Sequence, residues 1–229
     1  MSFKKVIKNH QFYWSHLSFV TSATIGLLFF VLSLVVNYFA GTYATARVSN
    51  SVKDILLDHL PQLDVKIIFI EGIIFFFFLV AVILFYKPQA IPFALKSLAL
   101  FVFTRSFFII LTHLAPSSHV EMSSANSIVS KFTFGGDLFF SGHTGLPFLM
   151  ALIFWDDWRL RTAFILLSVM FAGAVLLGHL HYSIDVFAAF FITYTVFHLA
   201  AVFFIKDFKR LNLREPWLVR LVARFSTEA

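Results

Sequence analysis

Six long apolar segments limit what this chain can fold into. A helix needs about 20 mostly apolar residues to cross the hydrocarbon core of a bilayer. A soluble core could not bury this much apolar surface, because 59% of the 229 residues are hydrophobic and only 13% are charged. The sequence therefore predicts an all-α, polytopic membrane protein that forms one domain over residues 1–229. The six expected transmembrane helices span residues 18–40, 65–86, 91–115, 138–155, 160–180 and 183–205.

Basic residues are distributed unevenly among the segments that connect these helices. Twelve Lys and Arg residues fall on one side of the membrane, and four fall on the other, namely Arg47, Lys53, Lys66 and Lys131. Cytoplasmic loops are enriched in Lys and Arg, so both termini are expected in the cytoplasm and the protein in the plasma (inner) membrane. The expected outer connections are residues 41–64, residues 116–137 and a tight turn near residue 181.

Segments at the membrane surfaces show mixed apolar and basic character. Residues 1–17 and the basic tail, 207–229, are expected to lie along the inner surface, anchored by Trp14 and Trp217. An anionic leaflet explains their charge better than nucleic acid does. Apolar residues within 41–64 recur at helical spacing, which predicts an amphipathic helix on the outer surface. They are Val48, Val52, Ile55, Leu56 and Leu60.

Ionisable residues inside the apolar segments converge at one depth. At 1.5 Å per helical residue, Glu71 lies about 10 Å below the outer surface. The same count places Arg105 and His143 about 20 and 18 Å from the inner side. His181 and Asp185 lie at the outer edge, where the last helix begins. Charged groups inside a bilayer are costly and are usually functional, so the sequence predicts a site in the outer half of the membrane.

The spacing of His181 and Asp185 is typical of catalysis. Residues four apart share one face of a helix, so the carboxylate can orient the imidazole and stabilise its charged form. His143 then adds a second acid or base, and Arg105 adds a planar donor for phosphate oxygens. Two alternatives stay open: Arg105 and Glu71 could form a purely structural ion pair, and the polar cluster could belong to a non-catalytic transporter.

Neither a metal ion nor another cofactor is expected. His179 and His181 stand two positions apart, so on a helix they would point in different directions, and no third ligand follows in a usual arrangement. The absence of cysteine excludes disulfides, thiolate metal sites and a cysteine nucleophile.

Four motifs resemble those of the sphingomyelin synthase family, in the same order along the chain. "GGDLFFSGHT" (135–144) and "HYSIDVFAAFFIT" (181–193) are similar to the family's third and fourth motifs. "RSFFIILTHLAP" (105–116) is similar to the second, and "LPQLD" (60–64) is a weaker match to the first. The resemblance covers roughly residues 60–205 and implies a six-helix membrane enzyme within the type 2 phosphatidic acid phosphatase superfamily.

The chain departs from the phosphatases of that superfamily at two basic positions. Their first motif has a Lys followed, after six residues, by Arg-Pro, whereas Lys96 is followed by Phe103 at that spacing. Their third motif has Ser-Arg where this chain has Ala174 and Val175. The loss of two phosphate-binding cations favours a phosphodiester substrate over a phosphomonoester.

The resemblance also implies roles for individual residues. His181, oriented by Asp185, would attack phosphorus and form a phosphohistidine, while His143 would serve as general acid and then as general base. Arg105 would hold the phosphate. The remaining candidate substrate contacts are Asp64, Glu71, Asp137, Ser141 and Gly142.

The expected activity is transfer of a phospholipid headgroup. Phosphocholine or phosphoethanolamine would move from a glycerophospholipid to a lipid alcohol such as ceramide, and diacylglycerol would be released. The main alternative is a lipid phosphatase or phospholipase C-type hydrolase that uses water as the acceptor. The expected partners are these two lipids and the membrane. The residues leave the headgroup, the acceptor and the oligomeric state open.

Overall fold

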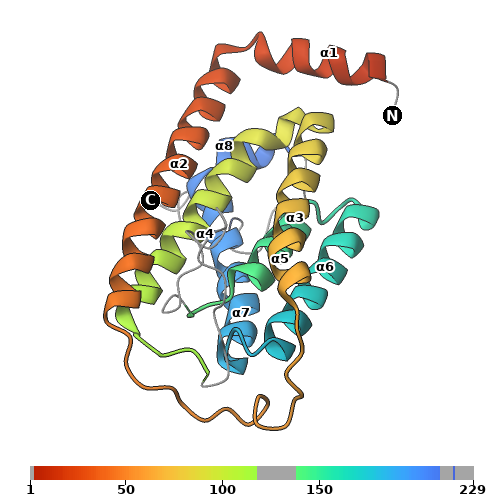
Figure 1. Ribbon diagram of the computed structural model, residues 1–229. Helices are drawn as coiled ribbons and strands as arrows, with labels where there is room; N and C mark the ends of the chain where they lie inside the picture. Colours follow the sequence, from red (N-terminus) through yellow and green to blue (C-terminus); the bar gives the residue numbers. More distant parts are fainter. Residues whose placement is uncertain (1–2, 118–137, 212–218, 220–229) are drawn as a thin grey trace.

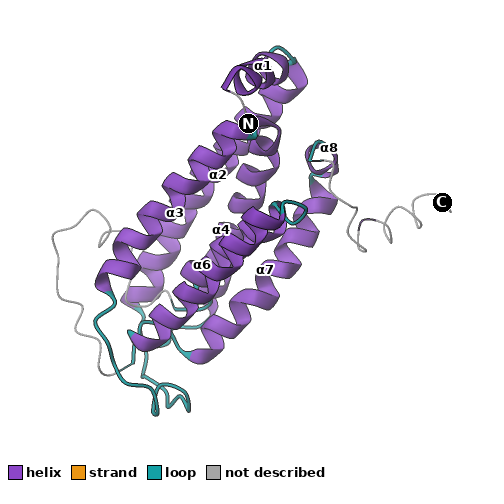
Figure 2. Cartoon of the chain, turned by 90° about the vertical axis from the view of Figure 1, so that its right-hand side faces the viewer, coloured by secondary structure: helices purple, strands orange, loops and turns teal. Residues whose placement is uncertain are grey.

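The computed structural model describes residues 3–117, 138–211 and 219. This part of the chain is helical and contains no strand, which confirms the all-α prediction. Figures 1 and 2 show the helices gathered into one bundle, with the loop between α2 and α3 closing one end. The elements are α1 Phe3–Trp14, α2 Leu17–Ala46, α3 Lys66–Tyr86, η1 Pro88–Ala90, α4 Ile91–Leu111, α5 Gly142–Ile153, α6 Trp158–Leu177, α7 Ser183–Phe203 and α8 Ile205–Lys209.

Five of the described helices are long and apolar enough to cross a membrane: α2, α3, α4 with η1, α6 and α7. The fourth expected segment forms the shorter apolar helix α5, which has 12 residues. It is short because the helix begins only at Gly142, where the side chain of Ser141 caps its first turn. These lengths and compositions suggest a multi-pass membrane protein.

The short helix α5 has the central position in the bundle. It packs against α3, α4, α6 and α7, whereas α2 packs mainly on α4 (Figure 1). The face of α2 toward α4 is rich in small residues, which allow two helices to approach closely. The buried small residues of this face are Ala23, Gly26, Ser33, Ala40, Gly41 and Ala44.

The outer surface of the bundle is strongly apolar, as lipid contact requires. In the run of four phenylalanines on α3, Phe76 is buried while Phe75, Phe77 and Phe78 are exposed. Since α3 presents large apolar side chains outward along its length, the run serves mainly as lipid-facing surface.

The amphipathic helix expected within residues 41–64 is not present. Helix α2 continues to Ala46, and residues 48–65 form an irregular segment with one turn near Asp58. The side chain of Asp54 accepts hydrogen bonds from the backbone of Leu56 (2.9 Å) and Leu57 (3.2 Å). Side-chain bonds of this kind compete with helix formation. Tertiary contacts hold the segment instead, including a 2.8 Å bond from Ser49 N to the carbonyl of His113.

The N-terminal helix and α8 lie at the same end of the bundle (Figure 1). Most of the N-terminal segment 1–17 forms helix α1. His10 donates from Nε2 to the carbonyl of Phe85 (2.8 Å) and accepts at Nδ1 from Trp14 (3.2 Å), which fixes α1 to the end of α3. Of the basic tail, the structure describes residues up to 211 and residue 219, so most of that expectation lies outside the described residues.

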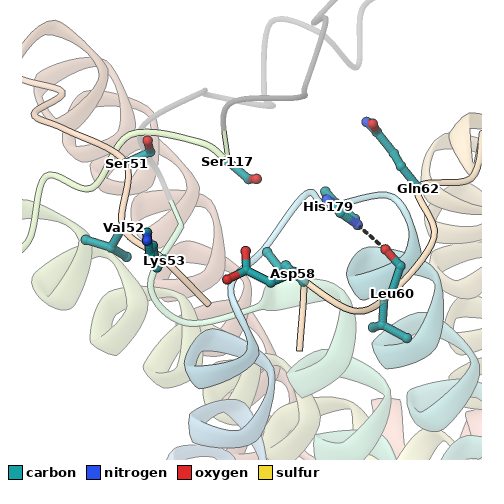
Figure 3. A pocket seen from close by; sticks show the side chains of 9 residues that line it. Ser51, Val52, Lys53, Asp58, Leu60, Gln62, Ser117 and His179 are labelled. Atoms are coloured by element: carbon teal, nitrogen blue, oxygen red, sulfur yellow. Dashed lines mark hydrogen bonds between the residues drawn. The ribbon is translucent and has the colours of Figure 1, made fainter. Parts of the chain in front are cut away.

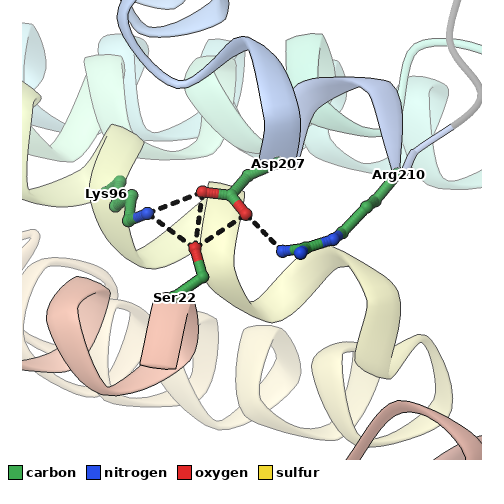
Figure 4. Close-up of polar contacts among 4 residues, drawn as sticks. All are labelled: Ser22, Lys96, Asp207 and Arg210. Carbon is green, nitrogen blue, oxygen red and sulfur yellow. Dashed lines mark hydrogen bonds and ion pairs between the residues drawn. The ribbon is translucent and has the colours of Figure 1, made fainter. Parts of the chain in front are cut away.

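A buried polar cluster at this end explains Lys96. Its Nζ lies 2.6 Å from Asp207 Oδ2 and 2.7 Å from Ser22 Oγ, and Arg210 contacts the other oxygen of Asp207 (Figure 4). Removing one partner of such a pair would leave an uncompensated buried charge. Lys96 therefore fixes α8 against α2 and α4. It precedes Arg105 by nine residues, about 13 Å along the helix, so it is directed away from the candidate site.

Candidate active site

The turn between α6 and α7 places the first catalytic candidate. Leu180 N donates to Val175 O (2.9 Å) and His179 N to Leu176 O (3.0 Å), the two bonds of a Schellman motif. His179 has a φ of 53°, the left-handed conformation that this motif requires. The turn is therefore sharp, and it places His181 directly before α7.

His181, two residues before α7, and Asp185, on the first turn of α7, form a buried pair. Nδ1 of His181 lies 3.5 Å from Oδ2 of Asp185, and the two side chains are 7% and 0% exposed. The backbone N–H of Tyr182 also donates to Asp185 Oδ2 (3.0 Å). In the described part of the chain, neither His181 Nδ1 nor Asp185 Oδ1 has a hydrogen-bond partner. Catalytic hydrogen bonds are often long before substrate binds, so this geometry suits a carboxylate that orients a reactive imidazole.

The chain that enters α5 is held between α4 and α7. Arg105 Nε donates to the carbonyl of Phe140 (2.9 Å), and Ser141 N donates to the carbonyl of Asp185 (3.1 Å). A Cβ atom at Gly142 would lie 3.6 Å from Arg105 Nε. Arg105, the start of α5 and the His181–Asp185 turn are therefore directly linked.

His143 lies one residue further along, in a mostly aromatic environment. Its ring stacks on Phe69 (centroids 3.9 Å apart) and meets the edge of Phe171 (5.6 Å). Nε2 lies 3.2 Å from the carbonyl of Phe69. A carbonyl only accepts, so Nε2 carries the hydrogen and Nδ1 is the nitrogen that can exchange a proton. His143 is close enough to His181 and Arg105 to interact with both electrostatically.

The other sequence candidates are placed less centrally. Ser141 is buried and caps α5, with its Oγ 3.2 Å from Thr144 Oγ1. Asp64 is exposed and accepts from Lys66 N (3.1 Å) before α3. Glu71 is exposed, and no ion pair joins it to Arg105 within the described residues. Asp137 lies outside the described residues.

Sequence reasoning missed two residues that contact the His181–Asp185 turn. Asp54 Oδ2 accepts from Ser183 N (2.7 Å). Tyr182 is buried, and its hydroxyl donates to the carbonyl of Ala115 (2.8 Å) and accepts from Val52 N (3.2 Å). Tyr182 lies within the "HYSID" motif, but Asp54 belongs to no motif, so no local signal identifies it.

A polar cavity of about 600 Å³ opens beside the segment between α2 and α3 and the turn before α7. Figure 3 shows His179 at its wall, with Nε2 bonded to the carbonyl of Leu60 (3.2 Å). His143 and His181 are not among its described lining residues. That lining consists of Ser51, Val52, Lys53, Leu57, Asp58, Leu60, Gln62, Ser117 and His179. Among the described residues, no three His, Asp or Glu side chains gather closely enough to hold a metal ion.

The comparisons with known proteins support one superfamily. Residues 135–202 match the family model described as "PAP2 superfamily C-terminal", a stretch that contains α5, α6 and all but the last residue of α7. The match supports the type 2 phosphatidic acid phosphatase superfamily, whose members are generally lipid phosphatases or phosphotransferases. No curated protein and no solved structure matches the chain.

Gly145 is expected to be essential for the packing that brings these helices together. A Cβ atom there would lie 2.6 Å from Phe101 Cε2 on α4 and 2.8 Å from Thr193 Oγ1 on α7. Gly145→Ala should therefore push α5 away from both helices and cost about 1–3 kcal/mol of stability. Thermal unfolding in detergent measures this loss.

Gly173→Ala is the matched control, because a Cβ at Gly173 meets no described atom within 4 Å. We expect this control to unfold at the wild-type temperature or slightly above it, since alanine favours helix. Equal unfolding temperatures for the two variants would show that the close packing at Gly145 is unimportant.

Proposed function

We propose that this protein is a phospholipid headgroup phosphotransferase. The observation that carries the proposal is the buried His181–Asp185 pair, with the start of α5, which contains His143, bonded to Asp185 through Ser141. Arg105 is linked to the same turn through Phe140 and Ser141. A nucleophile with an orienting carboxylate, a second acid or base and a guanidinium are together sufficient for phosphoryl transfer through a covalent intermediate.

The reaction proceeds in two displacements. Asp185 holds the hydrogen on Nδ1 of His181, so Nε2 attacks phosphorus and the bond to the diacylglycerol oxygen breaks. Protonated His143 gives its proton to that oxygen. In the second step, neutral His143 takes a proton from the incoming hydroxyl group, whose oxygen attacks phosphorus and breaks the bond to His181. Both imidazoles then return to their starting states.

Two positions support a phosphodiester over a phosphomonoester substrate. Lys96 is paired with Asp207 near α8, so its ammonium is committed elsewhere. Ala174 and Val175, where the phosphatases carry Ser-Arg, are both buried, and Val175 packs among apolar side chains. The guanidinium of Arg105 suits a phosphate that carries a single negative charge. Phosphocholine or phosphoethanolamine lipids are therefore the proposed donors.

The environment of His143 favours a lipid acceptor over water. Phe69 and Phe171 cover its ring, and exclusion of water limits hydrolysis of a reactive intermediate. A lipid alcohol such as ceramide is already concentrated and oriented in the bilayer. The alternative of a phospholipase C-type or phosphatase activity shares the same first step and differs only in the acceptor.

The deciding experiment supplies purified protein with headgroup-labelled phospholipids, with and without ceramide, and follows products by lipid mass spectrometry. We expect ceramide to divert most of the headgroup into a new phospholipid with release of diacylglycerol, and slow headgroup release without an acceptor. Water-soluble headgroup as the sole product, whichever alcohol is supplied, would identify a hydrolase. An absence of any turnover would favour the transporter alternative.

We also propose that the site faces the outer side of the plasma (inner) membrane, with both termini cytoplasmic. The Lys and Arg distribution supports this orientation, and α1 and α8 lie at the opposite end of the bundle from the start of α7 (Figure 1). Because the chain has no cysteine, Ser51→Cys introduces a single exposed thiol. An impermeant thiol reagent should label it in intact cells. Labelling only after lysis would contradict the orientation.

A further inference from the structure

The segment between α2 and α3 is fixed to the first turn of α7 by a buried carboxylate. Asp54 is 9% exposed. Its Oδ1 accepts from Leu56 N and Leu57 N within the segment, and its Oδ2 accepts from Ser183 N at 2.7 Å. Burial acts to raise the pKa of Asp54, but these hydrogen bonds outweigh it and hold the pKa below its ordinary value. The carboxylate is therefore ionised at neutral pH.

A second contact joins the same segment to the neighbouring residue of α7. The hydroxyl of Tyr182 accepts from Val52 N and donates to the carbonyl of Ala115. The Tyr182 ring is 2% exposed and packs with Leu57 and Leu138. Two adjacent residues, Tyr182 and Ser183, are thus held from the same side, between His181 and Asp185.

Two carboxylates accept from two adjacent N–H groups at the start of α7. The first N–H groups of a helix have no partner within the helix. Asp185 accepts from Tyr182 N (3.0 Å), while Asp54 accepts from Ser183 N. Because Asp54 accepts from Ser183, the carboxylate of Asp185 can still accept a hydrogen bond from His181, whose Nδ1 is 3.5 Å away. Without Asp54, the unpaired N–H of Ser183 would compete for the same carboxylate.

We propose that Asp54, together with Tyr182, is a positioning residue that holds the His181–Asp185 pair in reactive geometry. This inference rests on the proposed function for its kinetic consequence. Asp54 contacts neither histidine, and it acts through Ser183 and the first turn of α7. A displacement of about 1 Å in a catalytic group can slow a reaction 100-fold, so the effect should appear in the chemical step rather than in lipid binding.

The test compares Asp54→Asn and Tyr182→Phe with wild type in lipid nanodiscs. Asn keeps the shape of Asp, but its NH₂ group would face one of the backbone N–H groups that donate to Asp54. Phe keeps the ring of Tyr182 and removes only the hydroxyl. Rapid quenching with a labelled phospholipid gives the amount of phosphohistidine and its rate of formation. The hydrogen-exchange rates of the backbone amides of residues 181–185 report how rigidly the turn is held, and they do not depend on activity. Asp58→Asn is the matched control, because Asp58 is an exposed carboxylate in the same segment.

We expect both variants to form phosphohistidine about 10–100-fold more slowly, with KM within about threefold of wild type and an unchanged burst amplitude. Their 181–185 amides should exchange faster, and the control should match wild type in every measurement. A wild-type rate per site in Asp54→Asn overturns the inference, as does a reduced burst amplitude with an unchanged rate, which would indicate loss of folded protein alone.

If wild-type protein forms no phosphohistidine, the proposed function fails, and hydrogen exchange then tests the positioning role by itself. In that case unchanged exchange in both variants overturns the positioning role, and faster exchange supports it.

Discussion

His181→Ala is expected to abolish turnover, with a loss of about 10⁴-fold or more, as for other enzymes that lose a catalytic nucleophile. The reason is that the variant has no atom to form the covalent intermediate. His181 is buried beside Asp185 and its Nδ1 faces that carboxylate, which leaves Nε2 to attack phosphorus. Headgroup-labelled phospholipid, quenching in alkaline denaturant, which preserves the acid-labile P–N bond, and peptide mapping would show label on His181 in wild type and none in the variant.

Companion substitutions separate the roles within the pair. Asp185→Asn should keep the nucleophile but lose the orienting charge, so a trace of activity should remain. His143→Ala should be severely slowed because the departing diacylglycerol oxygen has no proton donor. His59→Ala is the control, since His59 is exposed and bonds only to the carbonyl of Ile55 four residues earlier among the described contacts. Substantial turnover by His181→Ala would exclude the covalent mechanism.

Arg105→Lys is expected to lower kcat/KM by about 10²–10³-fold, the usual effect of losing one donor to a developing charge. Lysine keeps the positive charge but lacks both the planar guanidinium and the Nε–H that donates to Phe140. The phosphate would then lose a two-point contact, and the chain entering α5 would lose its link to α4. Steady-state kinetics with the preferred phospholipid measure the effect.

Arg47→Lys is the matched control at the same end of the bundle. Arg47 is exposed and lies over the ring of Tyr43, so its replacement should leave turnover unchanged. Near-normal activity in Arg105→Lys would mean that Arg105 supplies only charge. The structural-pair alternative already has little support, because Glu71 is exposed and forms no ion pair with Arg105 within the described residues.

The helices and the main catalytic candidates follow from local sequence. The length and composition of an apolar segment determine whether it can cross a bilayer, so five long helices and the short α5 overlap the expected segments, although α2 continues to Ala46 and α6 begins at Trp158. His181 and Asp185 are near in sequence and do meet, but His181 precedes α7, so the turn before the helix brings them together and not a shared helical face.

Partners that are distant in the chain were decided only by the tertiary structure. Asp54 and Ser183 are 129 positions apart, and Lys96 and Asp207 are 111 apart. Residues 48–65 have the apolar spacing of a helix, but the carboxylate of Asp54 is used within the segment and on α7. A hydrophobic pattern records which side chains avoid water, and it contains no information about which buried donor will meet a particular acceptor. The sequence alone therefore determined the helices and the His181–Asp185 pair, while long-range packing decided which residues hold that pair in place.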